Sequence, residues 1–266
     1  MSEADLLRRV CASYRTQRAM AGERVAHPLA TIVCAPSRPD VWDANFASGV
    51  FAHTPDEIQN LLEALDAAMP REVRVRKFFC DPFTPQPFVA RLAVEGFARE
   101  GTVQLVLEGD LLARPRELKI RRARSDTDWA VVADLTADDM REAAHREGRE
   151  PPRADFLRQF VGMRREISSE MHMWLARDRG EDCGFLASWP GVERMGMVEW
   201  LFTRMEHRRR GIATALITHA VADARARGAR EVLIGASAGA DAVPRRLYAS
   251  LGFRPVCATE EYSHFP

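Results

Sequence analysis

The stretch from residue 195 to 228 constrains the fold most, because a strand, a basic turn and a helix follow one another without a gap. The run GMVEWLFTRME is apolar and rich in strand-forming residues, so it predicts a strand that ends near Arg204. In GIATALITHAVADARARG, apolar side chains recur at helical spacing, and Gly228 is a typical helix stop. The residues between them, 208–211, are therefore predicted to form a strand-to-helix turn.

Such a turn is a candidate anion site. The first N–H groups of a helix have no partner within the helix, and the helix dipole adds partial positive charge there. Gly211 allows close approach to the backbone, small residues follow it, and three arginines precede it. The alternative is a solvated arginine patch in which Gly211 only starts a helix. No G-K-[ST] follows, so the turn is not a P-loop.

Helical and strand-like segments are mixed along the chain without strict alternation, which predicts an α+β fold with a mixed sheet flanked by helices. The order strand, helix, strand, helix ending in Gly-Phe, strand occurs over 41–108 and again over 194–263. In the first copy we expect strands over 41–51, 72–79 and 102–108, a helix that begins with a capping box of Thr54 and Glu57, and a helix over 86–94. We interpret this order as a weak internal repeat. A boundary at GDLLARPREL (109–118) then predicts domains at 1–113 and 117–266.

The chain's 266 residues carry 38 basic and 38 acidic side chains, which argues against a general nucleic-acid binder. Lys77 and Lys119 are the only lysines, and this arginine bias suggests a GC-rich bacterial genome. The five cysteines form no C-x-x-C pair and the histidines show no ligand spacing, so we expect no metal site. The charged N-terminus is unlike a signal peptide, and no apolar run could span a membrane, so we expect a cytoplasmic protein.

The basic turn resembles the Q/R-x-x-G-x-G/A motif of the GNAT superfamily of acyl-CoA-dependent N-acyltransferases. A second match follows at the expected interval, because RRLYASLGF (245–253) is similar to the family's closing helix with its tyrosine. The resemblance covers residues 118–266. It implies the GNAT fold with a splayed central sheet, a tandem of two such domains, and acetyl-CoA as cosubstrate without a metal.

The resemblance also assigns residues to the cofactor. The motif's backbone N–H groups would hold the CoA pyrophosphate, and the pantetheine arm would lie where strand 194–204 splays from strand 231–236. The closing helix often begins with an asparagine, and the equivalent position here, Asp241, departs from that pattern. The implied CoA-binding residues are Leu201, Phe202, Thr203, Arg208, Arg209, Arg210, Gly211, Ile212, Ala213, Thr214 and Asp241.

Two side chains are candidates for the chemistry of amine attack on a thioester. Tyr248 matches the family tyrosine that protonates the departing thiolate, and a phenol can do so while it stays neutral at pH 7. Glu199 stands in an apolar strand, where many members have an acidic residue that takes the amine proton. The alternatives are a packed aromatic and a surface or ion-paired glutamate.

Residues 1–110 show the repeat without the motif, since FAHTPDEIQ places Pro55, Asp56 and Glu57 at the helix start. We therefore predict a degenerate copy that does not bind CoA. The acceptor, a small-molecule or peptide amine, is expected between about 135–165 and 256–264. Candidates there, and nearby on a strand, are Asp138, Asp139, His145, Glu147, Trp189, Tyr262 and His264.

Two other functions remain open: an acyl-CoA sensor without turnover, and nucleic-acid binding through Arg208–Arg210 and Arg121–Arg124. Neutral net charge speaks against the second. We expect neither a nucleic-acid nor a membrane partner, and the sequence leaves a homodimer open.

Overall fold

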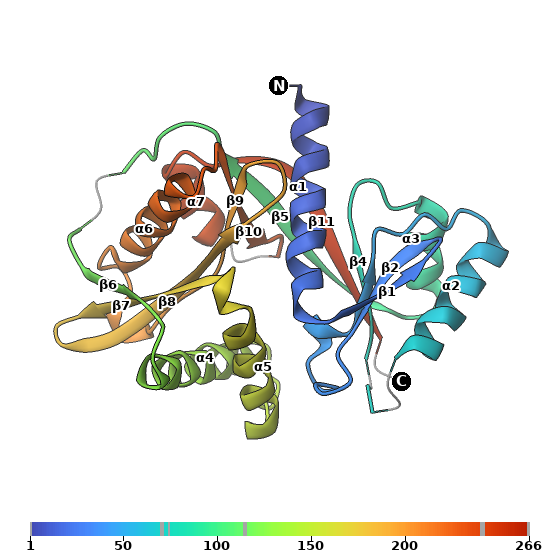
Figure 1. Cartoon of the computed structure of the whole chain (residues 1–266), viewed down its shortest axis with the longest axis horizontal. Coiled ribbons are helices and arrows are strands. Elements are labelled where there is room, and N and C mark those ends of the chain that lie inside the picture. Colours follow the sequence, from blue (N-terminus) through green and yellow to red (C-terminus); the bar gives the residue numbers. More distant parts are fainter. Residues whose placement is uncertain (1, 70–71, 74, 114–115, 240–242, 265–266) are drawn as a thin grey trace. The chain divides into compact units, whose positions relative to one another are not determined.

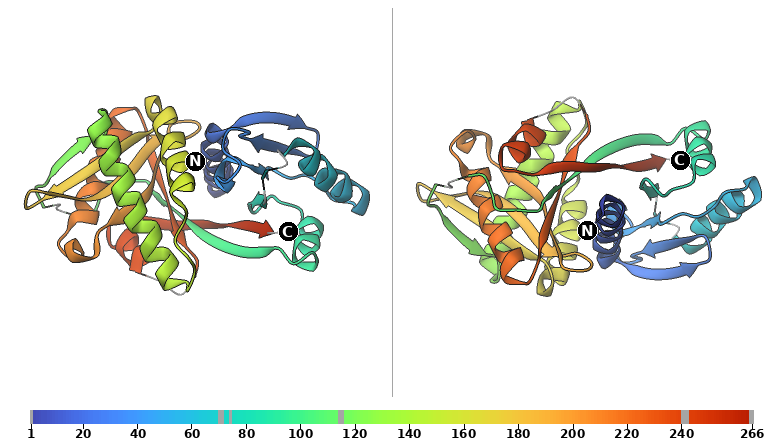
Figure 2. Two further views of the ribbon diagram at one scale, coloured as in Figure 1. Left: turned by 90° about the horizontal axis from the view of Figure 1, so that it is seen from below. Right: turned by 90° about the horizontal axis from the view of Figure 1, so that it is seen from above.

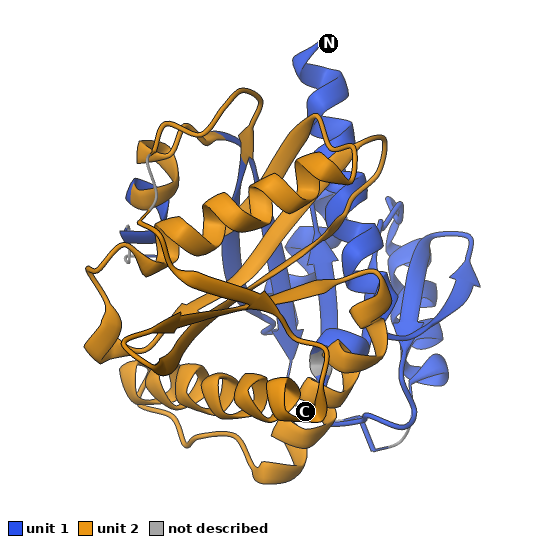
Figure 3. Ribbon diagram, turned by 60° about the vertical axis from the view of Figure 1, so that its left-hand side comes forward, with its two compact units in different colours: residues 1–105, 236–246, 255–266 blue, residues 106–235, 247–254 orange. Residues whose placement is uncertain are grey.

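The computed structural model describes residues 2–69, 72–73, 75–113, 116–239 and 243–264. The chain forms two compact units, coloured separately in Figure 3. Unit 1 contains Met1–Leu105, Ala236–Arg246 and Pro255–Pro266, and unit 2 contains Val106–Gly235 and Leu247–Arg254. The last strand of the sequence thus groups with the N-terminal half. The predicted domain limits, 1–113 and 117–266, stay a prediction.

Unit 1 is built on a mixed sheet with strand order β1-β2-β3-β4-β11-β5. Its strands are β1 (Glu23–His27), β2 (Ala30–Cys34), β3 (Phe46–Ser48), β4 (Arg76–Cys80), β5 (Ala98–Leu107) and β11 (Arg254–His264). β11 lies between β4 and β5 and pairs antiparallel with β4, so that Glu260 is opposite Cys80; Figure 2 shows it beside β5. The helices are α1 (Glu3–Arg18), α2 (Pro55–Ala68) and α3 (Gln86–Val94), with 3₁₀ turns η1 (Ala19–Ala21) and η2 (Trp42–Ala44).

Unit 2 has the strand order β10-β9-β8-β7-β6 (Figure 1). Its strands are β6 (Lys119–Arg122), β7 (His172–Asp178), β8 (Glu181–Pro190), β9 (Met195–Thr203) and β10 (Glu231–Ser237). β6 to β9 pair antiparallel, whereas β9 and β10 run parallel. Helices α4 (Asp126–Arg146) and α5 (Ala154–Glu166) cover one face, and α6 (Ile212–Ala226) covers the other (Figure 3). The remaining elements of unit 2 are η3 (Ile167–Ser169) and η4 (Met205–His207). Helix α7 (Val243–Ser250) belongs to unit 2 from Leu247 onward.

Local sequence explains where most helices begin. Thr54 and Glu57 form a capping box at the start of α2, as their spacing predicts, and Ser125 with Asp128 does the same for α4. The repeated element order is also present, as β3-α2-β4-α3-β5 and β9-α6-β10-α7-β11. The mixed α+β fold class is confirmed.

The expected strand over 41–51 is wrong, since only Phe46–Ser48 is extended and pairs. The reason is Asn45, whose side-chain amide donates to the carbonyls of Arg38 and Val41 and accepts from the Ala35 N–H. These bonds fold the preceding residues into a compact turn instead of a ladder. Similarly, the strand expected from residue 72 begins at Arg76. No helix in the described part of the chain is long and apolar enough to cross a membrane.

Candidate active site

The turn between β9 and α6 leaves its backbone donors open. Gly211 adopts φ 78° as the N-cap of α6, and no side chain caps the helix. The first helical N–H with an acceptor belongs to Ala215, which donates to the Gly211 carbonyl at 3.0 Å. No described residue accepts a hydrogen bond from the N–H groups of residues 209–214. The turn therefore presents a run of donors that an anion could satisfy.

Space is available at this turn. A Cβ built on Gly211 would meet only Arg116 Cβ, at 3.8 Å, among described atoms within 4 Å. The positive φ itself favours glycine, since other residues are strained there. Gly211 thus keeps both the backbone geometry and the access to the donors.

The three arginines of the turn differ in what their side chains contact. Arg208 donates through Nε to the Thr203 carbonyl at 2.9 Å and pairs with Glu142, so it ties the turn to β9 and α4. Arg210 pairs with Asp178 at 2.6 Å. Arg209 is exposed, has φ 60°, and makes no side-chain hydrogen bond or ion pair with a described residue. Only Arg209 has a side chain available for a ligand without loss of a protein contact.

Asp178, at the end of β7, holds the turn in place through contacts with three basic side chains. Its buried carboxylate contacts Arg210, Arg116 at 2.9 Å and His207 Nδ1 at 3.5 Å. Burial alone would raise the pKa of Asp178, but the His207 contact and the two arginine charges lower it below its usual value. Sequence reasoning missed this residue, because no spacing links Asp178 to a turn some thirty positions later.

Near the turn, β9 separates from β10 and forms a bulge against β8. It pairs with β10 from Met195–Glu231 to Val198–Ile234, and no further pair joins these strands in the described residues. On the β8 side, Phe202 lies opposite Phe185 and Glu199 opposite Ala187, so Trp200 and Leu201 face Leu186 alone in a β-bulge. Trp200 has φ 56°, a strained value for a tryptophan.

On the side of β10, this separation leaves β9 without ladder partners from Glu199 onward, and Leu201 also lies in the bulge against β8. Unpaired strand groups are sites for an extended ligand. Thr203 Oγ1 is also buried and has no hydrogen-bond partner in the described structure. The Thr203 carbonyl, in contrast, is already used by Arg208. The residues fit an extended, hydrogen-bonding chain along β9 that leads to the donors at 209–214.

Tyr248 and Glu199 lie close enough for their charges to interact. Tyr248 is 5% exposed on α7, with its ring 6.2 Å from that of Phe253. Burial, and then the negative charge of Glu199, raise the pKa of the Tyr248 phenol far above its usual value. The phenol is therefore neutral, and able to donate a proton, at any pH near 7. No described group forms a hydrogen bond with its hydroxyl.

The strand register assigns Glu199 to the face covered by α4 and α5. Ser188, opposite Val198, donates to Asp223 of α6 at 3.0 Å, so this pair points to the α6 face. Side chains alternate along a strand, so Glu199 and its partner Ala187 point to the other face. Glu199 is 8% exposed there.

The acceptor candidates are divided between the two units. Asp138 pairs with Arg204 at 2.7 Å, His145 and Glu147 are exposed, and Trp189 is buried, all in unit 2. Tyr262 and His264 belong to unit 1. Asp241 lies outside the described residues.

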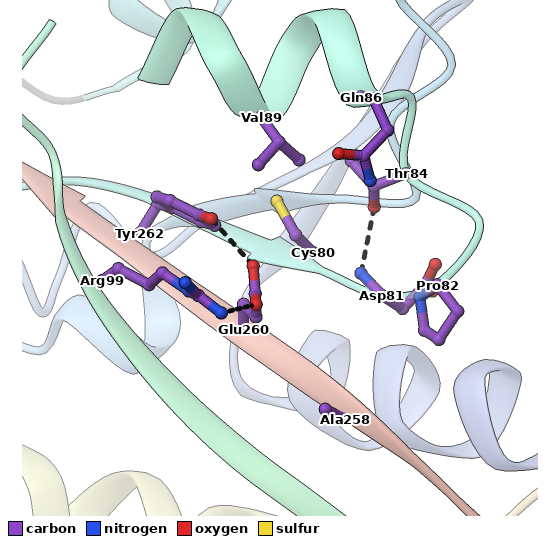
Figure 4. A pocket seen from close by; sticks show the side chains of 10 residues that line it. All are labelled: Cys80, Asp81, Pro82, Thr84, Gln86, Val89, Arg99, Ala258, Glu260 and Tyr262. Carbon is purple, nitrogen blue, oxygen red and sulfur yellow. Dashed lines mark hydrogen bonds and ion pairs between the residues drawn. The ribbon is translucent and has the colours of Figure 1, made fainter. Parts of the chain in front are cut away.

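Unit 1 has a cavity of about 270 Å³ beside the start of α3 (Figure 4). Tyr262 donates to Glu260 at 2.7 Å, Glu260 pairs with Arg99, and Cys80 lies beside them (Figure 4). Helix α2 occupies the place of α6 in the repeat. At its start, Thr54 and Glu57 form a capping box that occupies backbone N–H donors. Within the described residues, no cluster of His, Cys, Asp or Glu could hold a metal ion.

Comparison with known proteins agrees with this geometry. A sequence model of the acetyltransferase (GNAT) family matches residues 129–253. A comparison with curated proteins gave no significant match.

Solved structures share the fold over nearly the whole chain. A GCN5-related N-acetyltransferase from Kribbella flavida has a TM-score of 0.68 at 18% identity, over 97% of this chain and 95% of its own. A functionally unknown conserved protein from Staphylococcus epidermidis has a TM-score of 0.66 at 13% identity, over 92% and 94%. A tandem GNAT protein from the clavulanic acid biosynthesis pathway has a TM-score of 0.55 at 14% identity, over 98% and 94%. Residues 129–253 therefore form a domain of the acetyltransferase (GNAT) family, an acyl-transferring family, and the chain has the GNAT fold.

Proposed function

We propose that the chain is an N-acyltransferase that moves an acetyl group from acetyl-CoA to a primary amine, by direct attack within a ternary complex. The observation that carries this proposal is the open run of N–H groups at residues 209–214, next to strand β9, whose pairing with β10 ends at Val198. A diphosphate needs such donors, and a pantetheine arm needs such a strand. Family membership supports acyl transfer in general.

In this proposal the turn binds the nucleotide end of acetyl-CoA. The backbone N–H groups of Arg209, Arg210, Gly211, Ile212, Ala213 and Thr214 would hold the pyrophosphate. Arg210 and Arg208 would hold the turn in place through Asp178, Glu142 and the Thr203 carbonyl. The free guanidinium of Arg209 would contact the ribose phosphate. The pantetheine arm would lie along Leu201, Phe202 and Thr203.

The acyl step would use Glu199 and Tyr248. The amine must lose a proton to attack, and Glu199 would accept it directly or through a water molecule. As the C–S bond breaks, electrons move to sulfur, and Tyr248 would donate its proton to the thiolate. A neutral phenol suits the acid role, because burial and the nearby charge of Glu199 raise the pKa of Tyr248 and keep its proton on the oxygen near pH 7.

The N-terminal repeat would have no CoA site of its own. The start of α2 is closed, since Glu57 accepts from the N–H groups of His53 and Thr54, and Thr54 accepts from the Glu57 N–H. Two acidic residues in the first turn of α2 would also repel phosphate. We therefore assign CoA binding to residues 117–266 and a supporting role to residues 1–113.

The test combines binding with turnover. Calorimetry with acetyl-CoA should give saturable binding at one site per chain, and thiol release should appear with at least one member of a panel of primary amines. Saturable binding without thiol release for any amine would instead support the acyl-CoA sensor. Absence of acetyl-CoA binding would overturn both readings.

A further inference from the structure

A polar cluster lies on the α4–α5 face of unit 2, at the β9 bulge. Its members, here called the bulge-face cluster, are Asp139, Arg164, Trp189, Glu199 and Trp200. The Arg164 guanidinium stacks 3.9 Å from the centre of the Trp200 ring, and Trp189 lies against Trp200 at 4.9 Å between ring centres. The bulge thus brings aromatic surface and charged groups together.

Two contacts of α4 show where Asp139 lies. Arg164 donates to Thr136 Oγ1 at 3.4 Å, which joins this part of α4 to the bulge. Glu142 pairs with Arg208, which joins α4 to the cofactor turn. Asp139 is three residues from each, on the same helix face and about 4.5 Å along the axis from both. Its carboxylate is therefore positioned between the bulge and the turn, beside the proposed path of the pantetheine.

No described hydrogen-bond donor reaches the Asp139 carboxylate. It is half-buried and makes no hydrogen bond or ion pair with any described residue. Burial raises the pKa of Asp139 to about 6, and Glu142 adds to the increase, while Arg164, Arg146 and Arg208 oppose it. Glu199 is the carboxylate that faces this region from β9.

A second buried polar atom in the cluster also lacks a partner. The Trp189 indole is 2% exposed, and its Nε1 has no hydrogen-bond acceptor in the described structure. Buried polar groups in proteins are normally satisfied, so an exception indicates a place for a ligand or water. The cluster therefore offers one acceptor, Asp139, one donor, Trp189, and aromatic walls.

We propose that Asp139 binds the ammonium group of the acceptor, so that the acceptor is a cationic primary amine whose carbon chain packs against Trp189 and Trp200. The proposal rests on the transferase function above and names its substrate class. Asp139 would fix the amine beside the thioester, and Glu199 would take its proton.

Binding through Asp139 has a defined pH dependence, because only the ionised carboxylate attracts an ammonium group. With a pKa of about 6 the carboxylate is mostly ionised at pH 7. At pH 5 it is about one-tenth ionised, so amine affinity should fall roughly tenfold.

The test is a carbon-13 NMR titration of aspartate carboxyl groups in the CoA-bound protein, with the Asp139 signal assigned by its loss in Asp139→Asn. The probes are n-butylammonium, which stays charged below pH 9, and n-butanol, its neutral counterpart. Butylammonium should lower the Asp139 midpoint by about one pH unit or more, and butanol should leave it in place. An unchanged midpoint with butylammonium, or equal shifts with both probes, would overturn the proposal.

Matched variants and turnover separate this proposal from the transferase function. Asp134→Asn, an exposed position on the same helix, should keep the Asp139 response, and Asp139→Glu should restore amine binding that Asp139→Asn removes. Thiol release in the amine panel is measured independently. A shift of the Asp139 midpoint with amine but no turnover would support the ammonium site and reject the transferase function. Turnover without any such shift would support the transferase function and reject the ammonium site.

Discussion

Asp139→Asn should stabilise the protein near neutral pH. The pKa of Asp139 rises from 3.8 to about 6 on folding, so the folded state resists ionisation of this group. Below pH 3.8, Asp139 is protonated in both the folded and the unfolded state and does not reduce the free energy of unfolding. As pH rises through 6 its ionisation reduces that free energy by an increasing amount, which then reaches a constant value. The shift of about 2.2 pH units corresponds to about 3 kcal/mol at pH 7. Asparagine cannot ionise and avoids this loss.

The assay is urea unfolding followed by tryptophan fluorescence, which reports mainly on unit 2, because Trp129, Trp174, Trp189 and Trp200 lie there. The variant should gain about 3 kcal/mol in the free energy of unfolding at pH 7, but only about 1 kcal/mol at pH 4.5. The control Asp134→Asn should change it by less than about 0.5 kcal/mol at either pH. An Asp139→Asn protein that is no more stable than wild type at pH 7 would refute the reasoning.

Three further variants test the roles assigned to single side chains. Tyr248→Phe should lower kcat about 100-fold or more with an unchanged Kd for acetyl-CoA, and a normal kcat would remove the acid role. Because the pKa of this phenol is raised, the wild-type rate should show no loss from its ionisation up to pH 10. Glu199→Gln should lower kcat/KM about 100-fold at pH 7, with partial recovery at pH 9, where more amine is unprotonated; a uniform loss at both pH values would argue for a structural role. Arg209→Asn, chosen because asparagine tolerates a positive φ, should weaken CoA binding about tenfold but leave dephospho-CoA binding unchanged; equal losses for both ligands would contradict contact with the ribose phosphate.

The sequence predicts elements whose determinants are local. Capping residues such as Thr54 and Ser125 act within one helical turn, and the helix over 86–94 was predicted with its observed limits. The cofactor turn was predictable for the same reason, since Gly211 and its neighbours are contiguous. These features depend on spacing that can be counted along the chain.

Features that depend on distant partners were not predictable. The arginine triplet looks uniform in sequence, yet Asp178 and Glu142 give its members different roles. The bulge at Trp200 arises from the register between β8 and β9, and no local signal marks it. The turn around Asn45 resembles a strand in sequence, because the side-chain hydrogen bonds that form it reach residues up to ten positions away. Grouping of β11 with unit 1 likewise follows from pairing with β4.

The most direct measurement of the central claim is calorimetric titration of CoA into Gly211→Glu, with Gly228→Glu as the control. Gly228, after α6, also has a positive φ, 93°, and open space around its Cβ, so both variants carry similar backbone strain and the same added charge. If the N–H groups of residues 209–214 hold the pyrophosphate, Gly211→Glu should lose at least about 100-fold in CoA affinity, while Gly228→Glu binds as wild type does. Equal CoA affinity in the two variants would contradict the account.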